Sequence, residues 1–394
     1  MKHFVSIVLF FVLLLFTSKK NTSSNVIKAN KSVVKEAAAT PVEADVNVTE
    51  IALSLDTLFN QLHLTRNFNG AVLVAKNGKV LYDTIIGYSN VKLKTALPEE
   101  PIFQLASVSK QFTAYAILIL QKRGLINVEK EVSEYITGFP YAGVTVKMLL
   151  THTSGLPNYI YFWEQFKLNT NGFISNEDVI NAMLTYKPAP YLKPNVKYNY
   201  SNTNYAILAY LVEKLSNKAY ADFMATEVFE PLGMKNTYVW QPELKHINCV
   251  LGNESTRKLA ENDCYDGVTG DKGILSTTND LLLWDNALYG NSILNADELA
   301  DAFTNQNTQM KHRKAKYGYG WRISEDVAGN KLVWHGGWWH GFNTYIGRRE
   351  QDKTCVIILS NISNKSFFTS KGKVWDIVDR RSATSEGMAM DLEE

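Results

Sequence analysis

Strand-like segments lie near both ends of this chain, and a long helical region separates them. Residues 70–82 contain two β-rich runs joined at Asn77-Gly78, a strong signal for a tight hairpin turn. Four more strand-like runs occupy residues 317–323, 331–335, 343–347 and 354–360. This distribution predicts an α+β fold in which one antiparallel sheet is built from both chain ends. Helices flank this sheet, and the middle of the chain forms a mostly helical second subdomain.

The chain divides into four predicted segments. Residues 1–20 combine a short basic start with an apolar run from Phe4 to Phe16, which suits a signal peptide or an N-terminal membrane anchor. Residues 21–48 are rich in Ser, Asn, Lys, Ala and Thr and predict a disordered linker. Residues 49–364 form the folded domain, which opens with an amphipathic helix starting at Thr49 or Asp56. Residues 365–394 hold a final helix at 374–378 and an acidic tail. We expect an exported protein, either periplasmic or membrane-anchored and facing outward.

Composition and motifs narrow the function classes. A formal net charge of +2 over 394 residues gives no reason to invoke nucleic acid as a partner. The sequence has no Gly-rich phosphate loop, Cys-x-x-Cys pair or His-Glu-x-x-His motif, so no cofactor and no metal are predicted. Cys249 and Cys264 either form a disulfide or remain two thiols, and Cys355 suits a core strand. The oligomeric state stays open.

Ser107 and Lys110 are the strongest candidates for chemistry. Ser-x-x-Lys occurs five times in the chain, but only this copy begins a long apolar segment, which predicts a helix from Ala106 to Gln121. Ser107 would then lie in the first turn, with Lys110 one turn further along on the same face. A serine hydroxyl needs a base within hydrogen-bond reach, and a lysine becomes one when burial or nearby charge lowers its pKa.

Two further polar clusters supply partners for such a nucleophile. Tyr200 and Asn202 precede an apolar helix, where a phenol could relay a proton beside a cation and an amide could hold a substrate carbonyl or the lysine. His335-Gly336-Gly337-Trp338 ends an apolar run, and its glycines would let a substrate backbone approach closely. Backbone N–H groups there and at Ser107 could form an oxyanion hole. His152 could be a base, but a histidine before a Ser-Gly turn more often ties the loop together.

In this order and at these separations, Ser107-x-x-Lys110, Tyr200-x-Asn202 and His335-Gly-Gly resemble the serine β-lactamase and penicillin-binding-protein superfamily. The similarity is greatest to its class C-like branch, whose members include β-lactamases, D-alanyl-D-alanine carboxypeptidases, D-aminopeptidases and family VIII esterases. The resemblance covers about residues 49–361. Segments such as Leu149-Leu-Thr-His-Thr-Ser-Gly-Leu and Leu275-Ser-Thr-Thr-Asn-Asp-Leu also resemble the family.

The resemblance implies the β-lactamase/transpeptidase fold and a set of roles. Ser107 would attack a carbonyl to form an acyl-enzyme, with Lys110 and Tyr200 sharing the work of the base, and water would hydrolyse the ester. Which of the two takes the first proton stays open. The residues implied in substrate and oxyanion binding are Asn202, His335, Gly336, Gly337 and Trp338.

Two departures from the family pattern leave the substrate open. His335 replaces a lysine that would be a fixed positive charge, and histidine is mostly neutral at pH 7. Lys272 lies in a turn where the family usually has small residues. The first hypothesis is a serine hydrolase acting on a small ester, a D-amino-acid peptide or a peptidoglycan fragment. The second is a D-alanyl-D-alanine carboxypeptidase or weak β-lactamase, and the third is a catalytically silent relative that binds cell-wall fragments.

Overall fold

The computed structural model describes residues 42–244, 248–256, 258–290, 292–307 and 316–380. Its helices are α1 Val42–Arg66, α2 Lys110–Lys122, α3 Val146–Leu150, α4 Tyr159–Gln165, α5 Asn176–Tyr186, α6 Asn202–Ser216, α7 Tyr220–Met224, α8 Thr278–Ala287, α9 Ala296–Leu299 and α10 Lys365–Val378. None of these helices is long and apolar enough to cross a membrane. The predicted signal or anchor at 1–20 and the acidic tail from 381 lie outside the described residues.

The strands fall into two sets along the chain. The first set is β1 Gly70–Lys76, β2 Lys79–Ile86, β3 Tyr88–Asn90, β4 Thr95–Ala96, β5 Phe103–Gln104, β6 Tyr238–Val239, β7 Asn253–Ser255, β8 Lys258–Leu259 and β9 Ile274–Ser276. The second set is β10 Lys316–Tyr317, β11 Arg322–Glu325, β12 Lys331–Trp339, β13 Phe342–Arg349 and β14 Thr354–Ser360.

The main sheet confirms the prediction that both chain ends build one antiparallel sheet. Its order among the described strands is β10-β11-β12-β13-β14-β1-β2. Strand β1 pairs antiparallel with β14, from Gly70 opposite Ser360 to Lys76 opposite Thr354. The hairpin predicted at Asn77-Gly78 joins β1 to β2.

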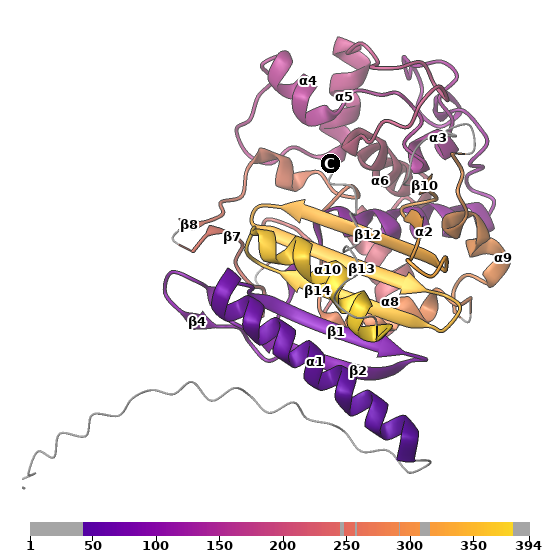
Figure 1. The fold of residues 1–394 in the computed structure, drawn as a ribbon. Coiled ribbons are helices and arrows are strands. Elements are labelled where there is room, and N and C mark those ends of the chain that lie inside the picture. The colour runs from indigo at the N-terminus through magenta and orange to yellow at the C-terminus, as the bar shows by residue number, and fades with distance from the viewer. Residues whose placement is uncertain (1–41, 245–247, 257, 291, 308–315, 381–394) are drawn as a thin grey trace, which may run out of the picture. The chain divides into compact units, whose positions relative to one another are not determined.

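Both faces of the sheet are covered, which explains why every residue of β14 is buried. Val356 and Ile358 pack in a cluster with Phe59 of α1 and Trp375 of α10. Residues of the opposite face join the larger core, which α2 and α8 also enter. Figure 1 shows α1 and α10 lying along one side of the sheet, with α4, α5 and α6 beyond strand β12.

Several element boundaries differ from those predicted. Helix α1 begins at Val42 rather than Thr49, so the last residues of the predicted linker 21–48 are helical. Helix α10 begins at Lys365 rather than 374, because its apolar residues pack against the sheet. Ser107 lies in a 3₁₀ turn, η1 Ala106–Ser109, and the α-helix starts only at Lys110.

A small second sheet fixes the turn that carries Ser107. Strand β9 lies between β5 and β6, with Gln104 opposite Leu275. The N–H of Leu105 donates to Ile274 O at 2.8 Å, and the N–H of Ile274 donates to Ser109 Oγ at 3.0 Å. The segment before Ser107 and the segment after Lys272 are therefore held together.

Candidate active site

Ser107 lies on a sharp turn between β5 and α2. The preceding residue, Ala106, has a φ of 49°, an uncommon conformation for a residue with a Cβ atom. Ala106 and Val108 are fully buried, whereas Ser107 is only half-buried. The turn thus presents the hydroxyl at the surface of a rigid, buried element.

Lys110 is completely buried, and its Nζ contacts three oxygen atoms. Nζ lies 3.0 Å from Ser107 Oγ, 2.9 Å from Asn202 Oδ1 and 2.7 Å from the backbone oxygen of Asp271. The amide and backbone oxygens can only accept hydrogen bonds, so they take two N–H groups of the amine. In a neutral lysine the lone pair would then face the Ser107 hydroxyl, which is the geometry that a general base requires.

Tyr200 is the second group at the nucleophile. Its hydroxyl donates to Ser107 Oγ at 2.9 Å. Lys110 Nζ lies 4.8 Å from the centre of the Tyr200 ring, and the Arg322 guanidinium lies 5.7 Å from it. Two cations therefore flank the phenol, and positive charge nearby favours the phenolate form that a proton relay needs.

The predictions from sequence missed Arg322. It begins β11 and pairs with Trp334 of β12, next to His335. A basic residue in a predicted strand was the available signal, but only the β11–β12 register brings it to the site. Arg322 places a permanent positive charge on the strand adjacent to the one that lacks the family's lysine.

His152 holds the loop that carries Tyr200, as the preferred interpretation predicted. Its Nδ1 accepts from the N–H of Ser201 at 3.3 Å and lies 3.0 Å from the amide nitrogen of Asn204. The N–H of Asn199 donates to its backbone oxygen at 2.8 Å, and its ring lies 4.2 Å from that of Tyr200. Burial, followed by the charge of Lys110, lowers its pKa well below the usual 6.5. His152 is thus a neutral support for Tyr200.

His335 is not where the sequence predicted it. We expected a substrate contact, but the side chain has no exposed surface. Its Nε2 lies 2.9 Å from the Tyr317 hydroxyl, and Nδ1 donates to Gly336 O at 2.6 Å. Burial, followed by the charge of Arg322, lowers its pKa well below 6.5. The structure therefore makes His335 a neutral link between β12 and β10.

The residues after His335 approach the nucleophile closely. A Cβ atom at position 337 would lie 2.4 Å from Leu105 O and 2.8 Å from the Ser107 backbone nitrogen, so only glycine fits there. At Gly336 the nearest atom would be 3.6 Å away, an ordinary contact. Trp338 is 54% exposed, and its Nε1 donates to Ser363 Oγ at 2.7 Å.

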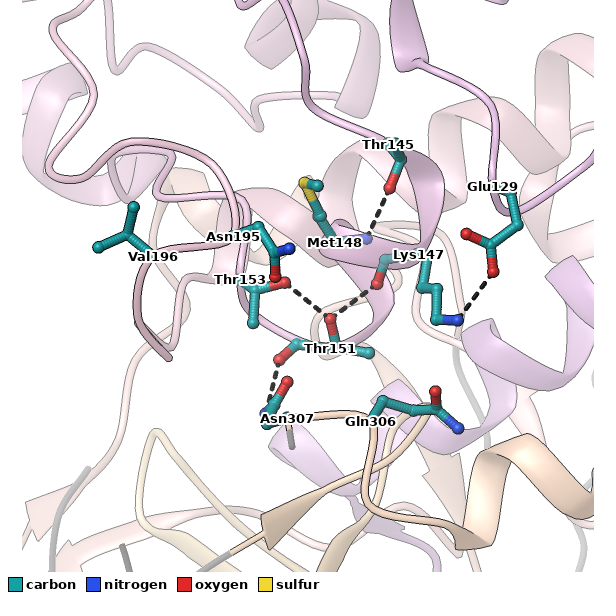
Figure 2. Close-up of a pocket in the computed structure, with 10 residues that line it drawn as sticks. All are labelled: Glu129, Thr145, Lys147, Met148, Thr151, Thr153, Asn195, Val196, Gln306 and Asn307. Atoms are coloured by element: carbon teal, nitrogen blue, oxygen red, sulfur yellow. Dashed lines mark hydrogen bonds and ion pairs between the residues drawn. The ribbon is translucent and has the colours of Figure 1, made fainter. Parts of the chain in front are cut away.

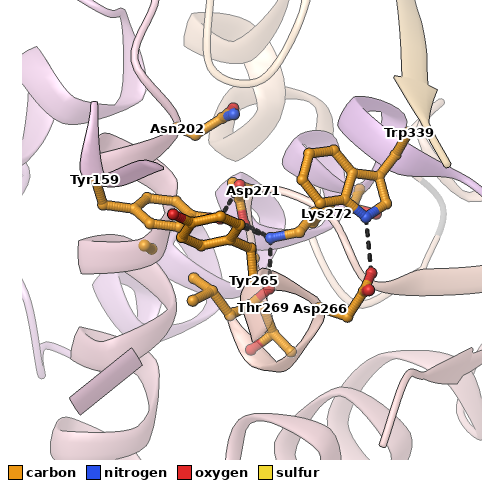
Figure 3. A network of polar contacts seen from close by, with 12 residues as sticks. Tyr159, Asn202, Tyr265, Asp266, Thr269, Asp271, Lys272 and Trp339 are labelled. Atoms are coloured by element: carbon orange, nitrogen blue, oxygen red, sulfur yellow. Dashed lines mark hydrogen bonds and ion pairs between the residues drawn. The ribbon is translucent and has the colours of Figure 1, made fainter. Parts of the chain in front are cut away.

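Lys272 is buried and does not lie open to the solvent. Its Nζ donates to the Tyr159 hydroxyl at 2.6 Å and to Val268 O at 3.1 Å, and it lies 3.5 Å from Asp271 Oδ1. Figure 3 shows this group, with the ring of Trp339 beside the Lys272 side chain at 5.0 Å from Nζ.

Two other features lie outside the predicted site. A polar pocket of about 270 Å³ is lined partly by Thr151 and Thr153, which flank His152, but by none of the predicted site residues (Figure 2). Asp263, Asp266 and His340 place one ligand atom each within 4.8 Å of one another, close enough to hold a metal. His340 Nε2 lies 3.1 Å from Asp266 and 3.7 Å from Asp263, so an ion pair already accounts for this cluster. Cys249 and Cys264 are not joined in a disulfide.

Comparison with known proteins identifies relatives over most of the chain. The profile of the family described as Beta-lactamase matches residues 55–378. "Penicillin-binding protein 4*" of Bacillus subtilis is 33% identical over 326 residues, which are 78% of this chain and 71% of that protein. "Protein flp" of Staphylococcus aureus is 26% identical over 75% of this chain, and the match spans 60% of its length.

Solved structures share the fold. The octameric penicillin-binding protein homologue from Pyrococcus abyssi has a TM-score of 0.72 and 25% identity, covering 84% of this chain and 78% of its own. The D-amino acid amidase from Ochrobactrum anthropi SV3 has a TM-score of 0.68 and 20% identity, covering 84% of this chain and 97% of its own. These likenesses establish a mixed α/β fold with a large antiparallel sheet.

Proposed function

The chain belongs to the beta-lactamase family, and on that premise we propose that it is a serine hydrolase that cleaves an ester or amide through an acyl-enzyme on Ser107. The observation that carries this proposal is the set of contacts at Lys110 Nζ. Two obligate acceptors, Asn202 Oδ1 and Asp271 O, fix the amine, and Ser107 Oγ is the third neighbour at 3.0 Å.

In the first step Ser107 Oγ attacks the substrate carbonyl carbon, and its proton passes to Lys110 or to Tyr200, both within hydrogen-bond distance. The proton then moves to the leaving oxygen or nitrogen as the carbonyl bond to it breaks. Lys110 and Tyr200 share this work, and the geometry is equally compatible with either as the first acceptor. In the second step the same groups take a proton from water, which attacks the ester and frees Ser107.

The negative oxygen of the tetrahedral intermediate would bind to the backbone N–H groups of Ser107 and Trp338. The close fit of Gly337 against the Ser107 nitrogen supports this assignment, because it brings the end of β12 alongside the turn. Each such donor contributes about 3 kcal/mol to a transition state of this kind. Asn202 would orient the substrate as well as Lys110.

An ester or a D-amino-acid amide or peptide is the substrate class that we favour. His335 is buried and neutral, so it supplies no fixed charge to a substrate carboxylate. A structural neighbour is named as a D-amino acid amidase, which supports the amide branch. The alternative, a D-alanyl-D-alanine carboxypeptidase or weak β-lactamase, is supported by the relatives named as penicillin-binding proteins and by the positive charge of Arg322.

Active-site labelling tests the proposal. Purified wild type should react with a fluorophosphonate probe and turn over a short-chain aryl ester, and Ser107→Ala should do neither. Wild type that neither probe nor labelled penicillin modifies, under conditions that label a known relative, would favour a silent binding protein. Turnover of D-phenylalanine amide against D-alanyl-D-alanine peptides then separates the two substrate classes.

We also propose that the protein is exported, either cleaved after its N-terminal apolar run or anchored by it. The support is the sequence from Phe4 to Phe16. Fractionation of cells that express the full chain with a C-terminal tag should place it outside the cytoplasm, and a cytoplasmic pool would contradict the proposal.

A further inference from the structure

A buried ion pair lies directly behind the lysine of the active site. Asp271 and Lys272 are 1% and 3% exposed, and Tyr159 is fully buried with them. Lys272 Nζ donates to the Tyr159 hydroxyl at 2.6 Å, and that hydroxyl donates to Asp271 Oδ2 at 3.2 Å. We call Tyr159, Asp271 and Lys272 the Lys272 cluster. Burying such a pair carries a desolvation cost, so its benefit must lie in what it positions.

The backbone beside the Lys272 cluster is held atom by atom. Four consecutive carbonyl groups each accept a hydrogen bond from a side chain of a different residue, at distances between 2.7 and 3.1 Å. The pairs are Val268 with Lys272, Thr269 with Asn176, Gly270 with Thr113, and Asp271 with Lys110. The last of these carbonyls is the one that orients Lys110.

The direction of Asp271 O matters for the chemistry of Lys110. A neutral amine has two N–H groups, and it can accept the Ser107 proton only if both are engaged elsewhere. Asn202 engages one, and the Asp271 carbonyl engages the other at 2.7 Å. Rotation of the 271–272 peptide would release the second N–H and turn the lone pair away from Ser107.

We propose that the Lys272 cluster is a positioning device for Lys110: it holds the Asp271 carbonyl in place and sets two opposite charges beside the base. This inference rests on the proposed function. The Asp271 carboxylate favours a protonated Lys110, whereas the Lys272 ammonium favours a neutral one. Loss of either charge should therefore shift the pH dependence of acylation, and in opposite directions.

Lys110 also faces other polar and charged groups, which the test leaves unchanged. They come from η1, the His152 loop, α6 with the residues before it, β11 and β12, and are Ser107, His152, Tyr200, Asn202, Tyr205, Arg322 and His335.

The experiment measures kcat/KM for an aryl ester against pH in Lys272→Met, Asp271→Asn and the double variant. Lys272→Met should lower kcat about 10- to 100-fold with less change in KM, and should move the acidic limb up by about 0.5 to 1 pH unit. Asp271→Asn should move that limb down. The double variant should return it to near the wild-type position.

Lys147→Met is the matched control, because it removes an exposed lysine that pairs with Glu129 at 2.8 Å. Its profile should match wild type. If Lys272→Met does not fold, Tyr159→Phe removes the shared hydroxyl and should lower kcat without moving KM. Variants that lose rate with an unmoved limb, or that shift it in the same direction, overturn the inference. An inactive wild type would overturn the proposed function instead.

Discussion

The protein buries two lysines within one small region, and their surroundings differ in charge. Lys110 Nζ contacts three neutral oxygens, those of Ser107, Asn202 and the Asp271 backbone. Lys272 Nζ lies 3.5 Å from the Asp271 carboxylate and donates to a phenol and a carbonyl. A carboxylate partner stabilises the ammonium, whereas neutral acceptors orient an amine without compensating its charge. Burial alone therefore does not identify a base, and the charge of the partners does.

The largest effect should come from removing the chemical groups themselves. Ser107→Ala and Lys110→Ala should each lower kcat/KM for an aryl ester by at least about 10³-fold, because the nucleophile or its base is lost. Lys272→Met should cost far less. Turnover by Lys110→Ala within tenfold of wild type would contradict the base role and erase the distinction between the two lysines.

An intermediate effect is expected at Arg322, the second cation beside Tyr200. Arg322→Gln should lower kcat about 10- to 100-fold, because the positive charge 5.7 Å from the ring no longer favours the phenolate. Arg322→Lys should recover part of the activity, since it keeps the charge. The control is Arg123→Gln, which removes an exposed arginine paired with Glu227. Equal losses in the Gln and Lys variants would point to packing rather than charge.

A smaller effect concerns the stability of the buried histidines. Burial holds the pKa values of His152 and His335 below 6.5, so the unfolded chain binds these two protons more readily than the folded one. The free energy of unfolding should therefore fall as pH drops below about 6.5, by about 1.4 kcal/mol per pH unit for each histidine. Urea unfolding between pH 5 and 7 measures this slope. His335→Gln should reduce it by one proton, and an unchanged slope would refute the assignment.

The smallest effect should come from His340 at the β12–β13 turn. Burial lowers its pKa, but Asp263 and Asp266 outweigh burial and raise it to about 9. Its contribution to stability is therefore complete below about pH 6.5 and is lost as pH rises through 9. Since the side chain is partly exposed, we expect about 1 kcal/mol. Thermal unfolding of wild type and His340→Gln should differ at pH 6 and converge at pH 10, and a constant difference would contradict this role.

The local sequence was sufficient for much of the fold. The turn at Asn77-Gly78 and the apolar pattern of residues 354–360 are short-range signals, and both elements lie where they predict. Helix α10 was harder to predict from its first residue, because its helical form depends on packing against β14 and α1 rather than on its own composition. The 3₁₀ turn at Ser107 was missed because the segment's apolar spacing fits a regular helix equally well.

In the candidate site, the sequence by itself determined which residue types were available, and Ser107, Lys110, Tyr200 and Asn202 come together as their spacing predicted. Only the tertiary structure decided that His335 faces Tyr317, that Arg322 lies beside Tyr200 and that Lys272 pairs with Asp271. The physical reason is that these roles depend on strand register and on burial. Both arise from contacts between residues far apart in the chain, which a local pattern does not encode.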